Sequence, residues 1–198
     1  MPKNIFKGII SFYKAPYNKT HPVKGFLRLC AWWIIRLCKL TRVKYRFWDN
    51  RFLYIDYNSF HCMWAMYNYI VDWEEFNAIK DFLQADDIAF DVGSNMGYYT
   101  VWMSKFIKSG KIYSFEPDER NFLKLTKNIV LNKIGNRVVT NKIALSDADG
   151  SVLFSNGLDG ENHIIQTASS AAILIKSQTL SSYCHQYGII IYITLNLT

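Results

Sequence analysis

The residues from Asp91 to Gly97 read Asp-Val-Gly-Ser-Asn-Met-Gly and join a short apolar run to a helix-like segment. Gly93 lets the chain leave a strand with a backbone conformation that other residues disfavour. Gly97 permits close approach at the start of a helix, where free amides and the helix dipole favour an electron-rich ligand. This spacing indicates a ligand-binding loop.

A carboxylate, Glu116, follows 19 residues after Gly97, at the end of the next predicted strand. It can accept hydrogen bonds from both hydroxyls of a ribose, because the carboxyl ends of neighbouring strands share one edge of an open α/β sheet. The nicotinamide fingerprint needs the pattern G-x-G-x-x-G, whereas this loop holds only Gly93 and Gly97. A cofactor without phosphates therefore suits the loop better, and S-adenosylmethionine is one. A nicotinamide-dependent reductase is the competing enzyme hypothesis.

Strand and helix patterns alternate around these residues, which predicts an α/β fold with a parallel sheet. Strands are expected at 88–92, 111–115, 137–145, 151–155 and 189–197, and helices at 98–107, 119–132 and 177–187.

The chain before residue 86 has a different character. Residues 1–80 hold 13 Lys and Arg against 5 Asp and Glu, whereas residues 81–198 hold 10 against 11. A helix is expected over 23–40, a hairpin over 44–57 and a single helix over 60–84.

The expected helix at 23–40 is amphipathic. At about 100° per residue, Lys24, Arg28, Arg36 and Lys39 lie on one side, and Leu27, Cys30, Trp33, Ile34 and Leu37 lie on the other. We expect the apolar side to dock on the sheet domain or on a partner. The alternative is peripheral contact with an anionic membrane surface through residues 23–40. No nucleic acid partner is expected, because no recognised binding motif accompanies the charge.

Composition limits the class of protein. Half of the 198 residues are hydrophobic, which excludes global disorder. No run of eighteen uncharged apolar residues and no secretory signal occurs, so we expect a cytoplasmic protein, with peripheral membrane contact as the variant. The four cysteines and four histidines show no metal-ligand spacing, so free thiols and no metal site are expected.

Several sequence blocks in order resemble the FkbM family of S-adenosylmethionine-dependent methyltransferases. They are Asp-Val-Gly-Ser-Asn-Met-Gly-Tyr-Tyr-Thr at 91–100, Phe-Glu-Pro at 115–117, Asn-x-x-Leu-Asn at 128–132 and Ala-Leu-Ser-Asp at 144–147. Trp-Glu-Glu at 73–75 and Gln-Thr-Leu at 178–180 extend the resemblance.

This resemblance implies a Rossmann-like methyltransferase sheet with helices on both faces, preceded by a basic α+β extension. It implies O-methylation of a hydroxyl on a sugar or natural-product-like substrate, such as a glycan or a lipid-linked sugar. The cofactor-binding positions it implies are Asp91, Gly93, Ser94, Asn95, Gly97, Glu116 and Ala144. The domains expected are a basic, aromatic segment at 1–43, a hairpin and helix at 44–85 and a partial methyltransferase domain at 86–198.

The sequence departs from the family pattern near its end. Ser181 stands where the family has Asp, and Thr194, Asn196 and Thr198 replace the Lys, Asp and Glu of the last strand. We therefore expect a C-terminally truncated or diverged member with an incomplete sheet. His163 is the candidate base that is left. The alternative is a non-catalytic remnant that acts through its basic helix.

Overall fold

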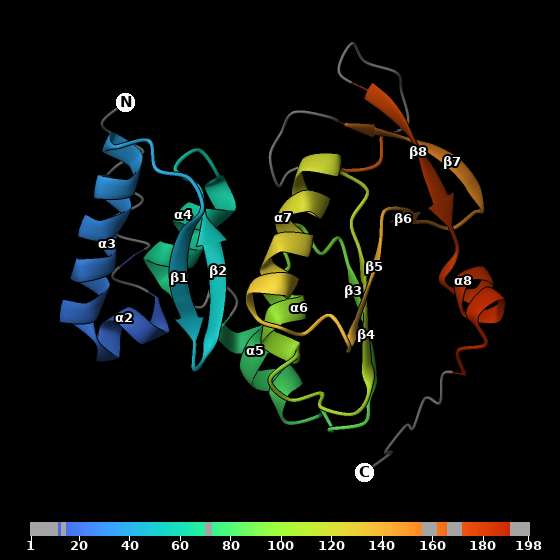
Figure 1. Cartoon of the computed structure of the whole chain (residues 1–198), viewed down its shortest axis with the longest axis horizontal. Helices are drawn as coiled ribbons and strands as arrows, with labels where there is room; N and C mark the ends of the chain where they lie inside the picture. Colours follow the sequence, from blue (N-terminus) through green and yellow to red (C-terminus); the bar gives the residue numbers. More distant parts are fainter. Residues whose placement is uncertain (1–11, 13–14, 70–72, 156–161, 166–171, 191–198) are drawn as a thin grey trace.

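The computed structural model describes residue 12 and residues 15–69, 73–155, 162–165 and 172–190. Figure 1 shows a basic part, made of helices and a hairpin, beside an α/β part. The elements of the basic part are α2 (Pro16–Thr20), α3 (Pro22–Leu37), β1 (Val43–Trp48), β2 (Arg51–Ile55) and α4 (Phe60–Asn68). Helix α5 (Trp73–Lys80) leads from them into the α/β part.

Three parallel strands form the centre of the α/β part, in the order β3-β4-β5. They are β3 (Ile88–Val92), β4 (Lys111–Phe115) and β5 (Val138–Asn141), joined through α6 (Tyr98–Met103) and α7 (Glu119–Leu131). The expected bounds of the first two strands are confirmed.

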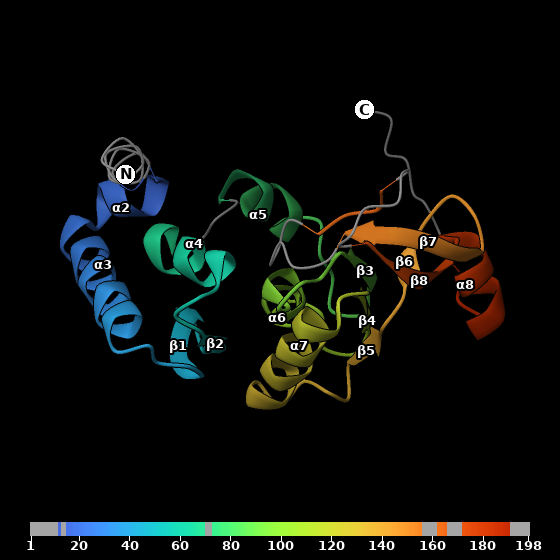
Figure 2. The same ribbon diagram turned by 90° about the horizontal axis from the view of Figure 1, so that it is seen from above.

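Side chains of β4 alternate between two helical layers, as the two-residue period of a strand requires. Ser114 faces α6, where its hydroxyl lies 2.7 Å from that of Thr100. Phe115 faces the other way and packs edge-on against Tyr183 of α8 (Leu180–Tyr187). Helices therefore cover both faces of the sheet, and Figure 2 shows the two layers from above. The expected Rossmann-like α/β class is confirmed.

A second, mixed sheet follows, in the order β6-β8-β7. Its strands are β6 (Ala144–Leu145), β7 (Gly150–Ser155) and β8 (Ala172–Gln178). The prediction of one strand over 137–145 is wrong, because the chain leaves the parallel sheet after Asn141 and pairs with β8 from Ala144 onward. Strand β8 was not predicted. Most of the strand expected at 189–197 lies outside the described residues.

The prediction of a single helix over 60–84 is also wrong. Helix α4 ends at Asn68, and Tyr69 has a φ of 67°, in the left-handed region that an α-helix cannot continue through. Helix α5 starts separately at Trp73. Apolar residues recur at helical spacing on both sides of the break, which is why the pattern alone suggests one helix.

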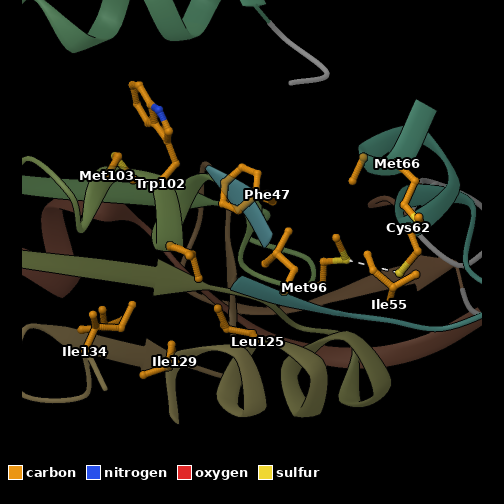
Figure 3. Packing of buried hydrophobic residues seen from close by; sticks show 14 of the residues in the cluster. Phe47, Ile55, Cys62, Met66, Met96, Trp102, Met103, Leu125, Ile129 and Ile134 are labelled. Atoms are coloured by element: carbon orange, nitrogen blue, oxygen red, sulfur yellow. Dashed lines mark hydrogen bonds between the residues drawn. The ribbon is translucent and has the colours of Figure 1, made fainter. Parts of the chain in front are cut away.

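One hydrophobic core joins the basic part to the α/β part. Figure 3 shows Phe47 and Ile55 of the hairpin and Cys62 of α4 beside Met96, which precedes α6, and Leu125 of α7. All five are buried. The thiol of Cys62 lies 3.7 Å from the sulfur of Met96. Burial in this core raises the pKa of the Cys62 thiol.

Asn128 of α7 and Asn132, the residue that caps its C-terminus, make hydrogen bonds along the open edge of the hairpin. Asn128 Oδ1 accepts from the amide of Tyr54, and Asn132 Oδ1 accepts from the amide of Phe52, each at 2.8 Å. Asn132 also donates to the Phe52 carbonyl at 2.7 Å. Four residues of helix rise about 6 Å and two residues of strand about 6.6 Å, so the spacings match. These side chains take the place of a third strand.

Helix α3 packs against the rest of the protein with the side opposite to its predicted apolar side. The sequence predicts docking of Leu27, Trp33 and Ile34, but all three are exposed. Gly25 and Trp32 are buried instead. A Cβ on Gly25 would stand 2.8 Å from the Phe12 ring and 2.9 Å from Asn18 Oδ1, so only glycine permits this approach. No helix in the described ranges is long and apolar enough to cross a membrane.

Candidate functional site

A pocket of about 220 Å³ opens where β3, β4 and β5 end. One wall follows the carboxyl ends of these strands, and the other comes from β7 and the residues paired with it. The lining residues are Val92, Gly93, Asn95, Phe115, Glu116, Pro117, Asn121, Ile143, Ala144, Leu145, Phe154, Asn162, His163 and Ile164. Ligands of open α/β sheets bind at this edge, so the position fits a binding site.

The backbone amides of the loop after β3 are engaged within the protein. Those of Gly93 and Ser94 both donate to the Phe115 carbonyl at 2.9 Å. The amide of Asn95 donates to Glu116 Oε2 at 2.7 Å, and that of Gly97 donates to the Ser94 carbonyl at 2.7 Å. The four loop amides are therefore already used within the protein and form no cradle for a ligand, whereas the prediction of free amides at the start of α6 stays a prediction.

Glu116 ties the ends of the first two strands together. Its Oε2 accepts from Asn95 and its Oε1 accepts from the amide of Asp118 at 2.9 Å. The residue is only 5% exposed. Burial raises the pKa of this carboxyl, although the two backbone hydrogen bonds act in the opposite direction. Each carboxylate oxygen has a further lone pair, so Glu116 can still accept from a hydroxyl in the pocket.

Asp91 is turned away from this pocket. Its carboxylate accepts a hydrogen bond from the Thr100 hydroxyl of α6, which also contacts Ser114 of β4. Burial raises the pKa of Asp91, and the hydrogen bonds from Thr100 oppose that rise. In this structure Asp91 holds α6 to the sheet.

Gly97 and Ser94 also lie outside the lining set. Gly97 has a φ of 86°, and a Cβ there would stand 2.7 Å from Leu125 Cδ1 of α7. Ser94 is buried, and its hydroxyl donates to the Asp91 carbonyl at 2.8 Å. Both residues therefore stabilise the loop through contacts inside the protein and not through the pocket. Gly93, with a φ of 75°, has open space where its Cβ would be.

The structure therefore sorts the predicted site residues into two groups. Gly93, Asn95, Glu116, Ala144 and His163 line the pocket. Asp91, Ser94 and Gly97 support it from inside the α/β core. Binding roles for all of them stay predictions.

His163 comes from a part of the chain far from the loop in sequence. Its backbone amide donates to the Ser155 hydroxyl at 2.8 Å, and its carbonyl accepts from the Ser155 amide at 2.9 Å. These bonds hold it beside β7, where its side chain is exposed at the pocket.

Sequence reasoning missed Asn121 and Asn162 as lining residues. Asn121 donates its amide to the side chain of Asp118, which caps α7. That capping pattern, one turn beyond Pro117, is a signal that could have placed Asn121 near the strand end. Asn162 donates to Asp118 Oδ2 at 3.2 Å, and no local signal predicts that contact.

The chain matches no protein-family model and no curated protein. It is similar to M. jannaschii TYW2 in complex with AdoMet, with 21% identity and a TM-score of 0.41 over 50% of this chain and 41% of that chain. P. horikoshii TYW2 in complex with MeSAdo is 15% identical with a TM-score of 0.42, and the match covers 69% of this chain and 53% of that chain. Pyrococcus abyssi tRNA (uracil-54, C5)-methyltransferase, in complex with S-adenosyl-L-homocysteine, is 15% identical with a TM-score of 0.38. That match covers 50% of this chain and 23% of that chain.

This chain thus spans between 23% and 53% of the length of those solved chains. At these identities, the activities of those proteins are not inferred for this chain.

Proposed function

We propose that the pocket binds S-adenosylmethionine and that the chain is a methyltransferase of the FkbM kind, acting on a hydroxyl of a sugar or natural-product-like molecule. One observation carries the proposal: Gly93, Asn95 and Glu116 meet at the ends of adjacent parallel strands while the amides around them are already engaged. That arrangement offers an acceptor for ribose hydroxyls and no cradle for phosphates.

Because the loop amides already make hydrogen bonds within the protein, the site favours S-adenosylmethionine over a dinucleotide cofactor. A pyrophosphate at such a turn is bound by free backbone amides at a helix start. Here the amides of Gly93 and Ser94 are held by Phe115. Helix α6 has only six residues, so its dipole adds little. A nicotinamide cofactor is therefore the weaker candidate.

The dimensions of the pocket also bear on the fit. Its volume of about 220 Å³ lies below the roughly 300 Å³ at which small-molecule sites begin. It can enclose the nucleoside end of the cofactor, with Glu116 at the ribose and the backbone of Ala144 beside the adenine. Gly93 also lines the pocket, and a Cβ there would meet nothing within 4 Å.

The chemistry asks little of the protein beyond alignment, because the bound cofactor supplies a methyl group on a sulfonium that leaves readily. The acceptor hydroxyl must still lose a proton to a base. His163 lines the pocket and is the side chain that we assign to take that proton on an imidazole nitrogen.

Calorimetric titration of the full chain with S-adenosylmethionine tests the cofactor. Glu116→Gln keeps the size of the side chain but removes its charge and makes one terminal atom a donor. We expect it to weaken binding at least about tenfold, as the loss of a charge-assisted hydrogen bond does. The matched control is Glu119→Gln. Glu119 lies three residues after Glu116, is exposed and pairs with Lys142, so this variant should bind as the parent does.

Thermal unfolding of each variant shows whether the loop has survived, since Glu116 also holds Asn95 and Asp118. Saturable binding of NADH in place of S-adenosylmethionine would overturn the assignment. A folded chain that binds neither would favour the non-catalytic alternative.

A further inference from the structure

Helix α3 carries an apolar stripe on the side that faces away from the rest of the molecule. Leu27 and Leu37 are 61% and 76% exposed, and Ile34 between them is 58% exposed. Val23, Phe26 and Trp33 extend the same stripe, which covers roughly a 120° arc of the helix. Figures 1 and 2 both place α3 at the outer edge of the molecule. A stripe of this kind on a protein surface marks a contact.

The opposite side of α3 is already in use. Trp32 and Ile35 are buried. Arg28 points to the same side: its guanidinium donates to Asn18 Oδ1 and to the Met66 carbonyl, and it lies 5.1 Å from the ring centres of both Tyr17 and Tyr69. These contacts fix the orientation of the helix, so rotation cannot hide the stripe.

The charge around the stripe has a single sign. Residues 1–48 contain eleven Lys and Arg and no Asp or Glu. On the helix, Lys24 borders one edge of the stripe and Arg36 borders the other. Arg36 and Lys39 also line a cavity of about 400 Å³ together with Asn58 and Ser59, at the C-terminal end of α3. Trp32 also lines this cavity, so the cavity lies on the packed side of α3 and not under the stripe.

We propose that α3 lies on an anionic phospholipid bilayer, with the stripe in the interface and with Lys24 and Arg36 at the level of the phosphates. An apolar face bordered by basic residues binds such surfaces, and each basic side chain adds attraction to anionic lipid. Trp33 suits the same depth, because indole rings gather at the membrane interface.

A second copy of the chain fits the stripe less well. Two α3 helices packed face to face would bring the bordering cations of both copies together, and like charges across an interface oppose association. The acyl region of a bilayer covers the stripe without that cost. This inference does not rest on the cofactor, so it can fail or succeed independently of the proposed function.

Co-sedimentation of the full chain with vesicles tests the proposal, using phosphatidylcholine alone and phosphatidylcholine mixed with phosphatidylserine. We expect binding to the mixed vesicles that falls as salt is raised. The double variant Leu27→Gln/Ile34→Gln should weaken it at least about tenfold, because both apolar side chains leave the interface. Val130→Gln/Leu174→Gln removes two apolar side chains elsewhere that are even more exposed, and this variant should bind unchanged.

The charge is tested separately by Lys24→Gln and Arg36→Gln. Each should weaken binding to the mixed vesicles roughly fivefold and leave the unfolding curve unchanged. Equal binding by the stripe variant and the control pair, or no binding to mixed vesicles at all, would overturn the proposal. Self-association in analytical ultracentrifugation that Leu27→Gln/Ile34→Gln abolishes, without lipid binding, would assign the stripe to a second copy instead.

Discussion

Helices α3 and α7 are both amphipathic, yet they use their two sides in opposite ways. In α7 the apolar residues Leu125 and Ile129 are buried and the charged Lys127 is exposed. In α3 the apolar stripe is exposed, and the side that packs includes the cation Arg28. Periodicity identifies a stripe in both helices, but it does not say what the stripe contacts.

The difference follows from what each helix meets. Helix α7 lies against β2 and the parallel sheet, whose apolar side chains complement its own. Helix α3 meets α2 and α4, where Asn18 and the Met66 carbonyl offer acceptors for a guanidinium. A partly buried guanidinium is tolerated where it finds hydrogen-bond acceptors, so polar complementarity can orient a helix against its hydrophobic pattern.

The largest expected effect contrasts the two sides of α3. Trp32→Ala removes a fully buried indole, so we expect a loss of roughly 3–5 kcal/mol in the free energy of unfolding. Leu37→Ala removes a side chain of the exposed stripe and should change it by less than about 0.5 kcal/mol. Urea unfolding of the two variants measures both values. Similar losses would mean that the stripe is packed in solution.

Helix α7 provides the next test. Asn128→Ala leaves the part-buried Tyr54 amide and the buried Met96 carbonyl without this partner, and a loss of roughly 2–4 kcal/mol is expected. Lys127→Ala, the exposed neighbour, is the control and should be close to neutral. If Asn128→Ala proved neutral, the hairpin would have to be held by its apolar contacts alone.

The third prediction tests whether the guanidinium of Arg28 stabilises the packed side of α3. Arg28→Met keeps much of the stem but removes the guanidinium that lies near the stacked rings of Tyr17 and Tyr69, which should cost roughly 1–3 kcal/mol. Lys24→Met on the same helix lies in an exposed position and should have little effect. The difference between the two chemical-denaturation midpoints gives the answer. A stabilising Arg28→Met would show that hydrophobic contact alone suffices to seat α3.

The smallest effect is a dependence of stability on pH. Burial raises the pKa of Asp91 in the folded chain above its value in the unfolded chain. The folded state then binds the proton more tightly, so this contribution to stability is full at pH values below the unfolded pKa and declines as pH rises through the folded pKa. Asp91→Asn removes the titration.

We therefore expect the stability of Asp91→Asn, measured relative to the parent by urea unfolding at a series of pH values, to increase across the carboxylate range. Parallel curves would contradict a raised pKa at this position.

Local patterns in the sequence were sufficient for a large part of the fold. The strands at 88–92 and 111–115 have the predicted bounds, because short apolar runs that end at Gly93 and Glu116 allow few other structures. The hairpin turn at Asp49 and Asn50 was located in the same way. Chain order alone also brought the loop and Glu116 to one edge of the sheet, because parallel strands end on the same side.

Other features depend on residues far apart in the chain. The second wall of the pocket reaches Gly93 only because β7 pairs with β8, and no local pattern places His163 there. The inward turn of Asp91 depends on Thr100 and Ser114, which lie on two other elements.

The sequence by itself determined that a helix with an apolar and a basic side begins after His21, although the helix ends at Leu37 and not at the expected residue 40. Only the tertiary structure decided which side faces out, because Gly25 packs against Phe12 and Arg28 donates to Asn18, and both partners lie outside the helix. Periodicity is a property of one segment, whereas orientation depends on the surface that the segment meets.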